Sequence, residues 1–171
     1  MCSSDLALKH FPGHGSSRSD SHQGFTDVTD TAELSVELKP YRALIAAGMA
    51  DSVMTAHVFN RGLDPWDPAT LSRFTVRRVL RGWLHYGGVA VSDDLLMGAI
   101  AQHYGLEDAA VRALGAGVDV LLISQNTGRI DDRAAERVVA AITRAIADGR
   151  LPESAVTAAV RRVDALRSRL K

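Results

Sequence analysis

Polar residues able to bind or react are concentrated in one short segment near the start of the chain. The stretch KHFPGHGSSRSDSH, from Lys9 to His22, contains three histidines, a lysine, an aspartate and two glycines. Residues of these types could hold a metal ion, cradle a phosphate group or supply the proton donor of a hydrolase. Because so many polar groups are costly to order inside a domain, we regard this segment as the first candidate for function.

The spacing of these residues disfavours a metal site and a phosphate site. His10 and His14 are four residues apart, as zinc ligands on a helix are, but Pro12 and the two glycines prevent a stable helix there, and the chain has no HExxH glutamate. The glycines are followed neither by the lysine-serine ending of a phosphate-binding loop nor by the dinucleotide fingerprint. A structural alternative stays open, in which a histidine of a polar loop, His14 above all, only caps backbone groups.

A pair of carboxylates follows an apolar run farther along the chain. Asp94 could act as the N-cap of a following helix. Asp93 shares the strand face of Val89 by alternation and is the first residue able to leave the end of that strand. A carboxylate nucleophile at Asp93 and a proton donor at His22 would form a hydrolase site, in which Asp20 could orient the imidazole.

Several elements must position these residues. Four short apolar runs rich in β-formers predict strands over residues 6–11, 51–59, 87–93 and 118–124. The runs are continuous rather than alternating, which is typical of parallel strands buried on both faces.

Helical patterns separate the predicted strands. One helix is predicted to begin at Asp30 as N-cap, with Glu33 completing a capping box. A second is predicted to begin at Asp67, followed by proline at the first helical position. Three more helices are predicted, over residues 106–116, 131–148 and 152–170. The first of these is predicted to end at Gly117.

The alternation of strands and helices predicts an α/β fold with a parallel sheet. Polar residues stand at or just past the C-terminal ends of successive strands: Lys9 and His10, then His57, then the Asp93-Asp94 pair. A βα barrel assembles its active site at that end of several strands, whereas an open sheet usually binds at one switch point. A barrel-like arrangement is therefore favoured.

The segments KHFPGHG, DSH, VMTAHV and VSDDLLMGAI together resemble glycoside hydrolase family 3. Within that family they are most similar to the bacterial β-N-acetylhexosaminidases of cell-wall recycling, and the resemblance covers nearly all of the chain after residue 6. It implies that residues 7–171 are part of a family 3 catalytic domain. The implied fold is the C-terminal half of a TIM (β/α)8 barrel, strands five to eight with their helices.

The resemblance also implies residue roles and a retaining, double-displacement mechanism. The family pattern places the nucleophile at Asp93, the general acid/base at His22 with Asp20 orienting it, and sugar-binding side chains at Lys9, His10 and Met97. The implied substrates carry a terminal β-N-acetylhexosamine, as in muropeptides or chitooligosaccharides, with water or phosphate as acceptor. Two alternatives stay open: another family 3 β-glycosidase, which should show Ser-Asp-Trp around the nucleophile, and a non-catalytic remnant that binds a sugar or a partner.

The chain departs from the family pattern in two places. Ser16 and Ser17 stand where the family often has Asp-Thr, and the first four βα units of the barrel, with an aspartate and an arginine that grip the sugar, have no counterpart here. We therefore expect the chain as given to be inactive or poorly folded by itself. The opening residues 1–6, MCSSDL, leave no room for an element before the first strand. Because a back-translation of CSSDL resembles a sequencing adapter, we expect this segment to be non-native.

Composition narrows the classes of partner. Twenty basic and twenty acidic residues give a formal net charge of zero without a basic block, which points to neither nucleic acid nor an anionic membrane surface. The apolar runs are too short to span a bilayer, and a single cysteine excludes an internal disulfide. The expected partner is an amino-sugar glycan, with no cofactor and no metal. The compartment, cytoplasmic by default, and the oligomeric state are not determined by the sequence.

Overall fold

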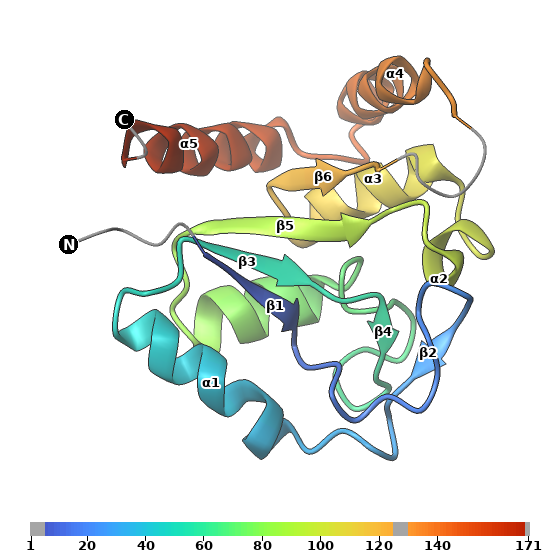
Figure 1. Cartoon of the computed structure of the whole chain (residues 1–171). Helices are drawn as coiled ribbons and strands as arrows, with labels where there is room; N and C mark the ends of the chain where they lie inside the picture. Colours follow the sequence, from blue (N-terminus) through green and yellow to red (C-terminus); the bar gives the residue numbers. More distant parts are fainter. Residues whose placement is uncertain (1–5, 125–129, 170–171) are drawn as a thin grey trace.

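A four-stranded parallel sheet forms the centre of the protein. The computed structural model describes residues 6–124 and 130–169. The strands lie in the order β1 (Ala7–Phe11), β3 (Ser52–Thr55), β5 (Val89–Asp94) and β6 (Val120–Leu122) (Figure 1). Each lies in one of the four predicted runs, except that β5 extends one residue beyond its run. All neighbouring pairs are parallel. The α/β class and the parallel sheet predicted from the sequence are therefore confirmed.

A second, smaller sheet lies at the C-terminal ends of these strands. The predicted strand over 51–59 divides into β3 and a short β4 (Val58–Phe59), because the chain leaves the main sheet at Ala56 and His57. Strand β4 pairs in parallel with β2 (Thr26–Asp27), an element that the sequence did not predict. This pairing holds the end of the segment that follows β1 beside strand β4.

The helices are α1 (Leu34–Ala46), the π-helix η1 (Phe74–Trp83), α2 (Gly98–Ala101), α3 (Leu106–Ala116), α4 (Ala134–Ala147) and α5 (Glu153–Arg169). The helix α3 ends as predicted, at Gly117, whose φ of 109° lies in the left-handed region that favours glycine. A β-carbon there would also meet Arg77 at 3.3 Å. The short α2 was not predicted.

Two predicted helix starts are wrong. α1 begins at Leu34, and its N-cap is Glu33 rather than Asp30, with no side-chain capping bond. In the second case Asp64 accepts the backbone N–H of Asp67 at 3.1 Å, which holds Asp67 in a turn. The helix η1 then begins at Phe74, two residues after Ser72, whose hydroxyl accepts the N–H of Thr75 at 3.0 Å.

The helices pack on one face of the sheet. Phe11, Val53 and Ala90 join the core with Leu38 and Tyr41 of α1 and with η1, and a second cluster joins α3 to α4. Because strand side chains alternate, the intervening residues point to the other face. That face carries Met54, Val91, Val120 and Leu122, and Figure 1 shows no helix in front of β3 or β5.

One buried ion network ties the sheet to two helices. The Asp119 carboxylate is fully buried and lies 2.8 Å from both Arg81 of η1 and Arg162 of α5. It also accepts the N–H of Ala90 at 2.9 Å, which fixes the start of β6 beside β5. Burial lowers the pKa of Arg81, and Asp119 opposes that shift.

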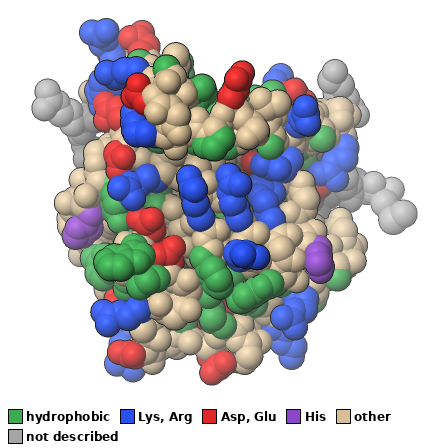
Figure 2. All heavy atoms as spheres, turned by 180° about the vertical axis from the view of Figure 1, so that it is seen from behind, with side chains coloured by type: hydrophobic (Ala, Val, Ile, Leu, Met, Phe, Trp, Pro, Cys, Tyr) green, Lys and Arg blue, Asp and Glu red, His purple; other side chains and the backbone are tan. Residues whose placement is uncertain are grey.

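The face behind that of Figure 1 has a mixed surface. Figure 2 shows a band of basic side chains across its middle, with hydrophobic and acidic groups around it. η1 contributes two exposed aromatic residues, Phe74 and Trp83, whose rings meet edge to face at 5.6 Å.

In residues 6–124 and 130–169, no helix is long and apolar enough to cross a membrane.

Candidate active site

The C-terminal ends of β1 and β5 bring two of the predicted site residues together. The His10 Nε2 atom lies 3.5 Å from Asp93 Oδ2, with 30% of the His10 side chain and 14% of the Asp93 side chain exposed. The Lys9–His10 and Phe11–Pro12 peptide bonds beside this pair are both cis. Burial lowers the pKa of His10, and the nearby Asp93 carboxylate opposes that shift. A histidine that stays neutral there can donate a hydrogen bond without adding charge.

The two adjacent aspartates have different surroundings. Asp93 Oδ1 accepts the following backbone N–H at 2.9 Å, which leaves Oδ2 toward His10. Asp94 is buried and accepts the N–H groups of Leu96 and Ser124, each at 3.1 Å, together with the Ser124 hydroxyl. The suggestion that Asp94 is a helix N-cap is wrong, because α2 is capped at Met97 without a side-chain bond. Asp94 instead joins the ends of β5 and β6.

His57 is buried and supports the backbone of Asp94. Its side chain is almost fully buried, and its Nε2 lies 2.9 Å from the Asp94 carbonyl oxygen. Because a carbonyl only accepts, Nε2 must carry a proton. Nδ1 lies 2.9 Å from the Thr70 hydroxyl, and burial lowers the pKa of the imidazole. The sequence placed His57 at a strand end without assigning it a role; its apolar neighbours Ala56 and Val58 were the signal that it is buried.

Asp20 and His22 form a dyad on the segment between β1 and β2. Asp20 Oδ1 accepts both the backbone N–H of His22, at 2.9 Å, and its Nδ1–H, at 2.8 Å. These two bonds, the backbone one first, lower the pKa of the Asp20 carboxyl. Because Nδ1 donates to Asp20, the proton that the ring gains or loses is the one on Nε2. The His22 side chain is 76% exposed. No hydrogen bond or ion pair joins it to Asp93 among the described residues.

Main-chain contacts hold the segment that carries this dyad. The N–H groups of Gly98 and Ala99 in α2 donate to the carbonyl oxygens of His22 and Ser21, each at 3.2 Å. A β-carbon on Gly98 would lie 2.8–2.9 Å from backbone atoms of His22 and Gln23, so this close approach requires glycine. No role was predicted for Gly98.

His14 has a structural role, but it bonds to side chains rather than to the backbone groups named in the alternative that the sequence left open. Its Nδ1 lies 2.8 Å from the Ser17 hydroxyl, and its Nε2 lies 2.9 Å from the Ser21 hydroxyl. The ring therefore connects two points of the same loop, the second of them directly before His22. Ser17, which departs from the family pattern, supplies one of these contacts.

The structure places the remaining predicted residues apart from these contacts. Lys9 is exposed on β1, next to His10. Met97, predicted near the sugar pocket, is 3% exposed at the start of α2, so its side chain packs inside the protein.

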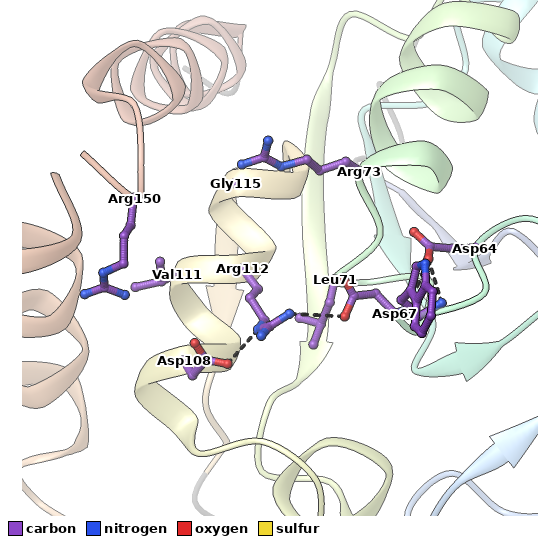
Figure 3. Close-up of a pocket in the computed structure, with 10 residues that line it drawn as sticks. Asp64, Asp67, Leu71, Arg73, Asp108, Val111, Arg112, Gly115 and Arg150 are labelled. Carbon is purple, nitrogen blue, oxygen red and sulfur yellow. Dashed lines mark hydrogen bonds and ion pairs between the residues drawn. The ribbon is translucent and has the colours of Figure 1, made fainter. Parts of the chain in front are cut away.

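A separate depression lies away from these residues (Figure 3). Its volume is about 380 Å³, and ion pairs from Arg112 to Asp67 and Asp108 cross it. It is lined by Asp64, Trp66, Asp67, Leu71, Arg73, Asp108, Val111, Arg112, Gly115 and Arg150, none of which is a predicted site residue.

Comparison with known proteins identifies the family. The model of the glycosyl hydrolase family 3 N-terminal domain matches residues 5–166. A β-hexosaminidase of Tolumonas auensis is 45% identical over 120 residues, which cover 69% of this chain and 36% of that protein. The β-hexosaminidase LpqI of Mycobacterium tuberculosis is 36% identical over 163 residues, which cover 91% of this chain and 40% of that protein.

Solved structures agree with this result. A family 3 β-N-acetylglucosaminidase from Paenibacillus sp. FPU-7 superposes with a TM-score of 0.87 at 40% identity, covering 95% of this chain and 30% of that one. A family 3 member from Mycobacterium smegmatis gives a TM-score of 0.78 at 38% identity, covering 94% and 48%. The chain thus spans less than half the length of these relatives, and its sheet is half of their TIM barrel. The chain belongs to glycosyl hydrolase family 3 and corresponds to part of its N-terminal domain.

Proposed function

We propose that this chain carries the catalytic residues of a retaining β-N-acetylhexosaminidase, with Asp93 as nucleophile and His22 as general acid/base. The observation that supports this most strongly is the contrast between two carboxylates. Asp93 keeps one oxygen directed to His10 at the end of a barrel strand. Asp20 is committed to the His22 ring and its backbone. One carboxylate is thus free to attack, and the other serves a histidine.

In the first step, Asp93 attacks the anomeric carbon while protonated His22 gives its Nε2 proton to the leaving oxygen. The bond from the anomeric carbon to that oxygen breaks, and a covalent glycosyl ester forms on Asp93. In the second step, neutral His22 takes a proton from water or phosphate as it attacks the same carbon and releases the carboxylate. Asp20 stabilises the charged ring before the first step and after the second, as its 2.8 Å bond to Nδ1 allows.

A histidine in this role has a physical advantage over a carboxylate. Two carboxylates in one site raise each other's pKa, because both cannot ionise freely. A neutral imidazole adds no negative charge beside Asp93. We assign to Lys9 and His10 the binding of sugar hydroxyls, since they are consecutive residues of β1 and His10 lies 3.5 Å from Asp93. We retain Met97, which is buried at the start of α2, as a third proposed sugar-site residue.

The substrate class is proposed from the relatives, which are named β-hexosaminidases and β-N-acetylglucosaminidases. We propose terminal, non-reducing β-N-acetylglucosamine on muropeptides or chitooligosaccharides. We also propose that the chain alone turns substrate over poorly, because within residues 6–124 and 130–169 strands β1 and β6 are unpaired edges of the sheet.

Covalent trapping tests the nucleophile without needing rapid turnover. A 2-acetamido-5-fluoro glycosyl fluoride should add one sugar to the chain, and the peptide that carries Asp93 should hold the added mass. Asp93→Asn should abolish labelling. Asp94→Asn, which changes the neighbouring carboxylate, should leave the label at Asp93. Labelling that persists in Asp93→Asn would show that the assigned nucleophile is wrong.

Another family 3 β-glycosidase is a weaker candidate. Such an enzyme should carry tryptophan directly after the nucleophile, whereas this chain has Asp94 there, bonded to Ser124. Comparing labelling by the N-acetylglucosamine and glucose forms of the reagent separates the two. A non-catalytic sugar-binding remnant would bind N-acetylglucosamine, detectable by NMR, without reacting with either reagent.

A further inference from the structure

We propose that an aromatic hollow beside the dyad loop, the segment between β1 and β2 that carries Asp20 and His22, binds an uncharged pyranose unit of a glycan chain. The hollow has a volume of about 320 Å³ and lies where β2 and β4 meet α2 (Figure 1). Neither edge strand of the main sheet lines it, nor does any residue assigned above to catalysis or to sugar binding. Its lining includes Phe25, Phe59, Trp66, Ala99, His103 and Tyr104.

Two of these aromatic side chains stand largely in solvent. Trp66 is 82% exposed and Phe25 is 50% exposed, although large aromatic residues usually bury most of their surface. Neither ring can contribute much to the core in this position. Exposed aromatic surface that gathers around one hollow, rather than being scattered singly, is typical of a binding site.

Phe25 is held in place by two neighbouring rings. Its ring centroid lies 5.3 Å from that of Phe59 and 5.7 Å from that of His103. Phe59 is buried and belongs to β4, whereas His103 follows α2, so the Phe25 ring is supported from two elements. The exposed part of the ring therefore forms a fixed surface.

A hydrogen-bonded turn presents Trp66 on the other side of the hollow. The Asp64 carboxylate accepts the backbone N–H of Trp66 at 2.9 Å and the hydroxyl of Ser72 at 2.7 Å. Pro65 and Pro68 restrict the backbone before and after the tryptophan. Because the backbone is already ordered, little conformational entropy remains to be lost when a ligand packs on the indole.

The chemistry of the lining selects an uncharged ring with one apolar face. No carboxylate, lysine or arginine lines the hollow, so a charged ligand would lose water there without gaining a counter-charge. The C–H groups on the face of a pyranose carry partial positive charge, and the faces of aromatic rings carry partial negative charge. The Trp66 indole N–H and the His103 ring can bond hydroxyls at the edge of the sugar. The volume, at the small end of ligand pockets, suits one pyranose unit.

The identity of the sugar rests on the proposed function, which supplies N-acetylglucosamine oligosaccharides. The hollow would hold one unit of such a chain apart from the unit that reacts at Asp93. It is also joined to the dyad loop. Phe25 follows His22 by three residues, and Ala99, which lines the hollow, donates its N–H to the Ser21 carbonyl oxygen at 3.2 Å. A glycan bound in the hollow thus packs on the elements that hold the dyad.

The two tryptophans of the chain provide a built-in test and control. The ¹⁵N-labelled 171-residue chain is titrated with N,N′,N″-triacetylchitotriose, and the two indole N–H signals are followed by NMR, with Trp83→Phe assigning them. The Trp66 signal should shift saturably. The Trp83 signal should not move, because Trp83 is 58% exposed on η1 and packs against Phe74, outside the hollow.

Substitution of single aromatic residues gives the second readout. Phe25→Ala should weaken the apparent affinity reported by Trp66 about three- to tenfold, as expected for the loss of one aromatic contact. The matched control, Phe74→Ala, removes an exposed phenylalanine outside the hollow and should leave the affinity unchanged. Far-ultraviolet circular dichroism of both variants checks that the fold is retained.

Lys9→Ala separates this site from the one proposed at Asp93. The Trp66 response should persist in this variant and should not depend on whether Asp93 can be labelled, so a failure of covalent trapping leaves the result intact. Three outcomes would overturn the second site: no Trp66 shift up to the solubility limit of the trisaccharide, equal shifts of both indoles, or loss of the Trp66 response in Lys9→Ala.

Discussion

The Asp20 carboxylate receives two hydrogen bonds from one residue, the N–H and the Nδ1–H of His22. This geometry fixes the tautomer of the ring, because only Nε2 is left without a proton. It also keeps Asp20 ionised, since both bonds favour the charged form and lower the carboxyl pKa. The dyad is therefore ordered even though both side chains are largely exposed.

His22→Ala should raise the pKa of Asp20 toward its ordinary value, but only in part. The larger cause of the lowered pKa is the backbone N–H of residue 22, which the substitution retains. Carbon-detected NMR titration of the Asp20 carboxyl measures the change. Glu107, whose carboxyl pKa is lowered by its hydrogen bond from Arg137, serves as an internal reference that should not move. A complete return of Asp20 to its ordinary value would contradict the assigned role of the backbone bond.

At the scale of elements, α2 connects the two halves of the proposed chemistry. It follows the strand that carries Asp93, and its first N–H groups hold the carbonyl oxygens of Ser21 and His22. The position of the dyad relative to the nucleophile thus depends on how closely α2 approaches the loop, and Gly98 sets that approach.

Gly98→Ala should displace the dyad loop, because its β-carbon would meet backbone atoms at 2.8–2.9 Å that cannot rotate away. We expect a loss of about 1–3 kcal/mol in the free energy of unfolding, typical of an overpacked site. The amide hydrogens of residues 98 and 99 should also exchange faster. Gly105→Ala is the matched control, because its β-carbon would meet only Glu107 at 3.9 Å. Unchanged exchange at residues 98 and 99 would show that the loop does not rest on α2.

Asp119 should be the most sensitive charged residue of the scaffold. Asp119→Asn removes the partner of the partly buried Arg81 and weakens the contact with Arg162. Breaking a buried pair in this way costs about 3–5 kcal/mol, measurable by urea denaturation. The exposed pair between Asp148 and Arg150 provides a control. Asp148→Asn should change stability by less than about 1 kcal/mol. Similar losses in the two variants would refute a special role for Asp119.

The sequence predicted which elements exist better than it predicted where the helices begin. The apolar runs located all four strands of the main sheet, and α3 ended at Gly117 because the left-handed conformation there needs glycine. The beginning of η1 was missed because Asp64, not Asp67, accepts the local backbone N–H groups. The two-residue strands and α2 were missed because such short elements depend on contacts distant in sequence, as between β2 and β4.

The candidate site shows the same division. Asp20, His22, His10 and Asp93 could be nominated from residue types and the family resemblance, and the structure pairs them two by two. The residues that support the site, His57 and Gly98, could not be identified from residue types or from the resemblance. His57 is fixed by Thr70 and by the backbone of Asp94, and Gly98 acts through the space it leaves empty. Neither interaction has a signature in local sequence.

For the whole molecule, burial of His57 makes stability depend on pH. Its folded-state pKa is lowered by desolvation, although the Asp94 carbonyl, Asp93 and Asp94 oppose this and His10 adds to it. Below about pH 6.5, the ordinary histidine value, the unfolded chain takes up a proton that the folded chain resists. The free energy of unfolding should therefore fall as the pH drops from neutral toward 5.

Urea denaturation at several pH values measures this dependence. His57→Gln should give a shallower loss of stability on acidification than the unchanged chain, whatever its stability at neutral pH. His10, whose pKa is lowered in the same direction, accounts for part of the slope that remains. His103→Gln, at an exposed position, should keep the full slope. An unchanged slope in His57→Gln would show that its imidazole is not the group responsible.

The attachment of the dyad loop to α2 has a consequence for how the chemistry can be altered. The contacts run through the carbonyl oxygens of residues 21 and 22, which every amino acid possesses. The identity of the side chain that we propose as the proton donor is therefore independent of how its backbone is anchored. A carboxylic acid could replace the imidazole at position 22 without removing the loop's attachment. In this way a single scaffold can exchange one type of acid for another by point substitution, both in evolution and at the bench.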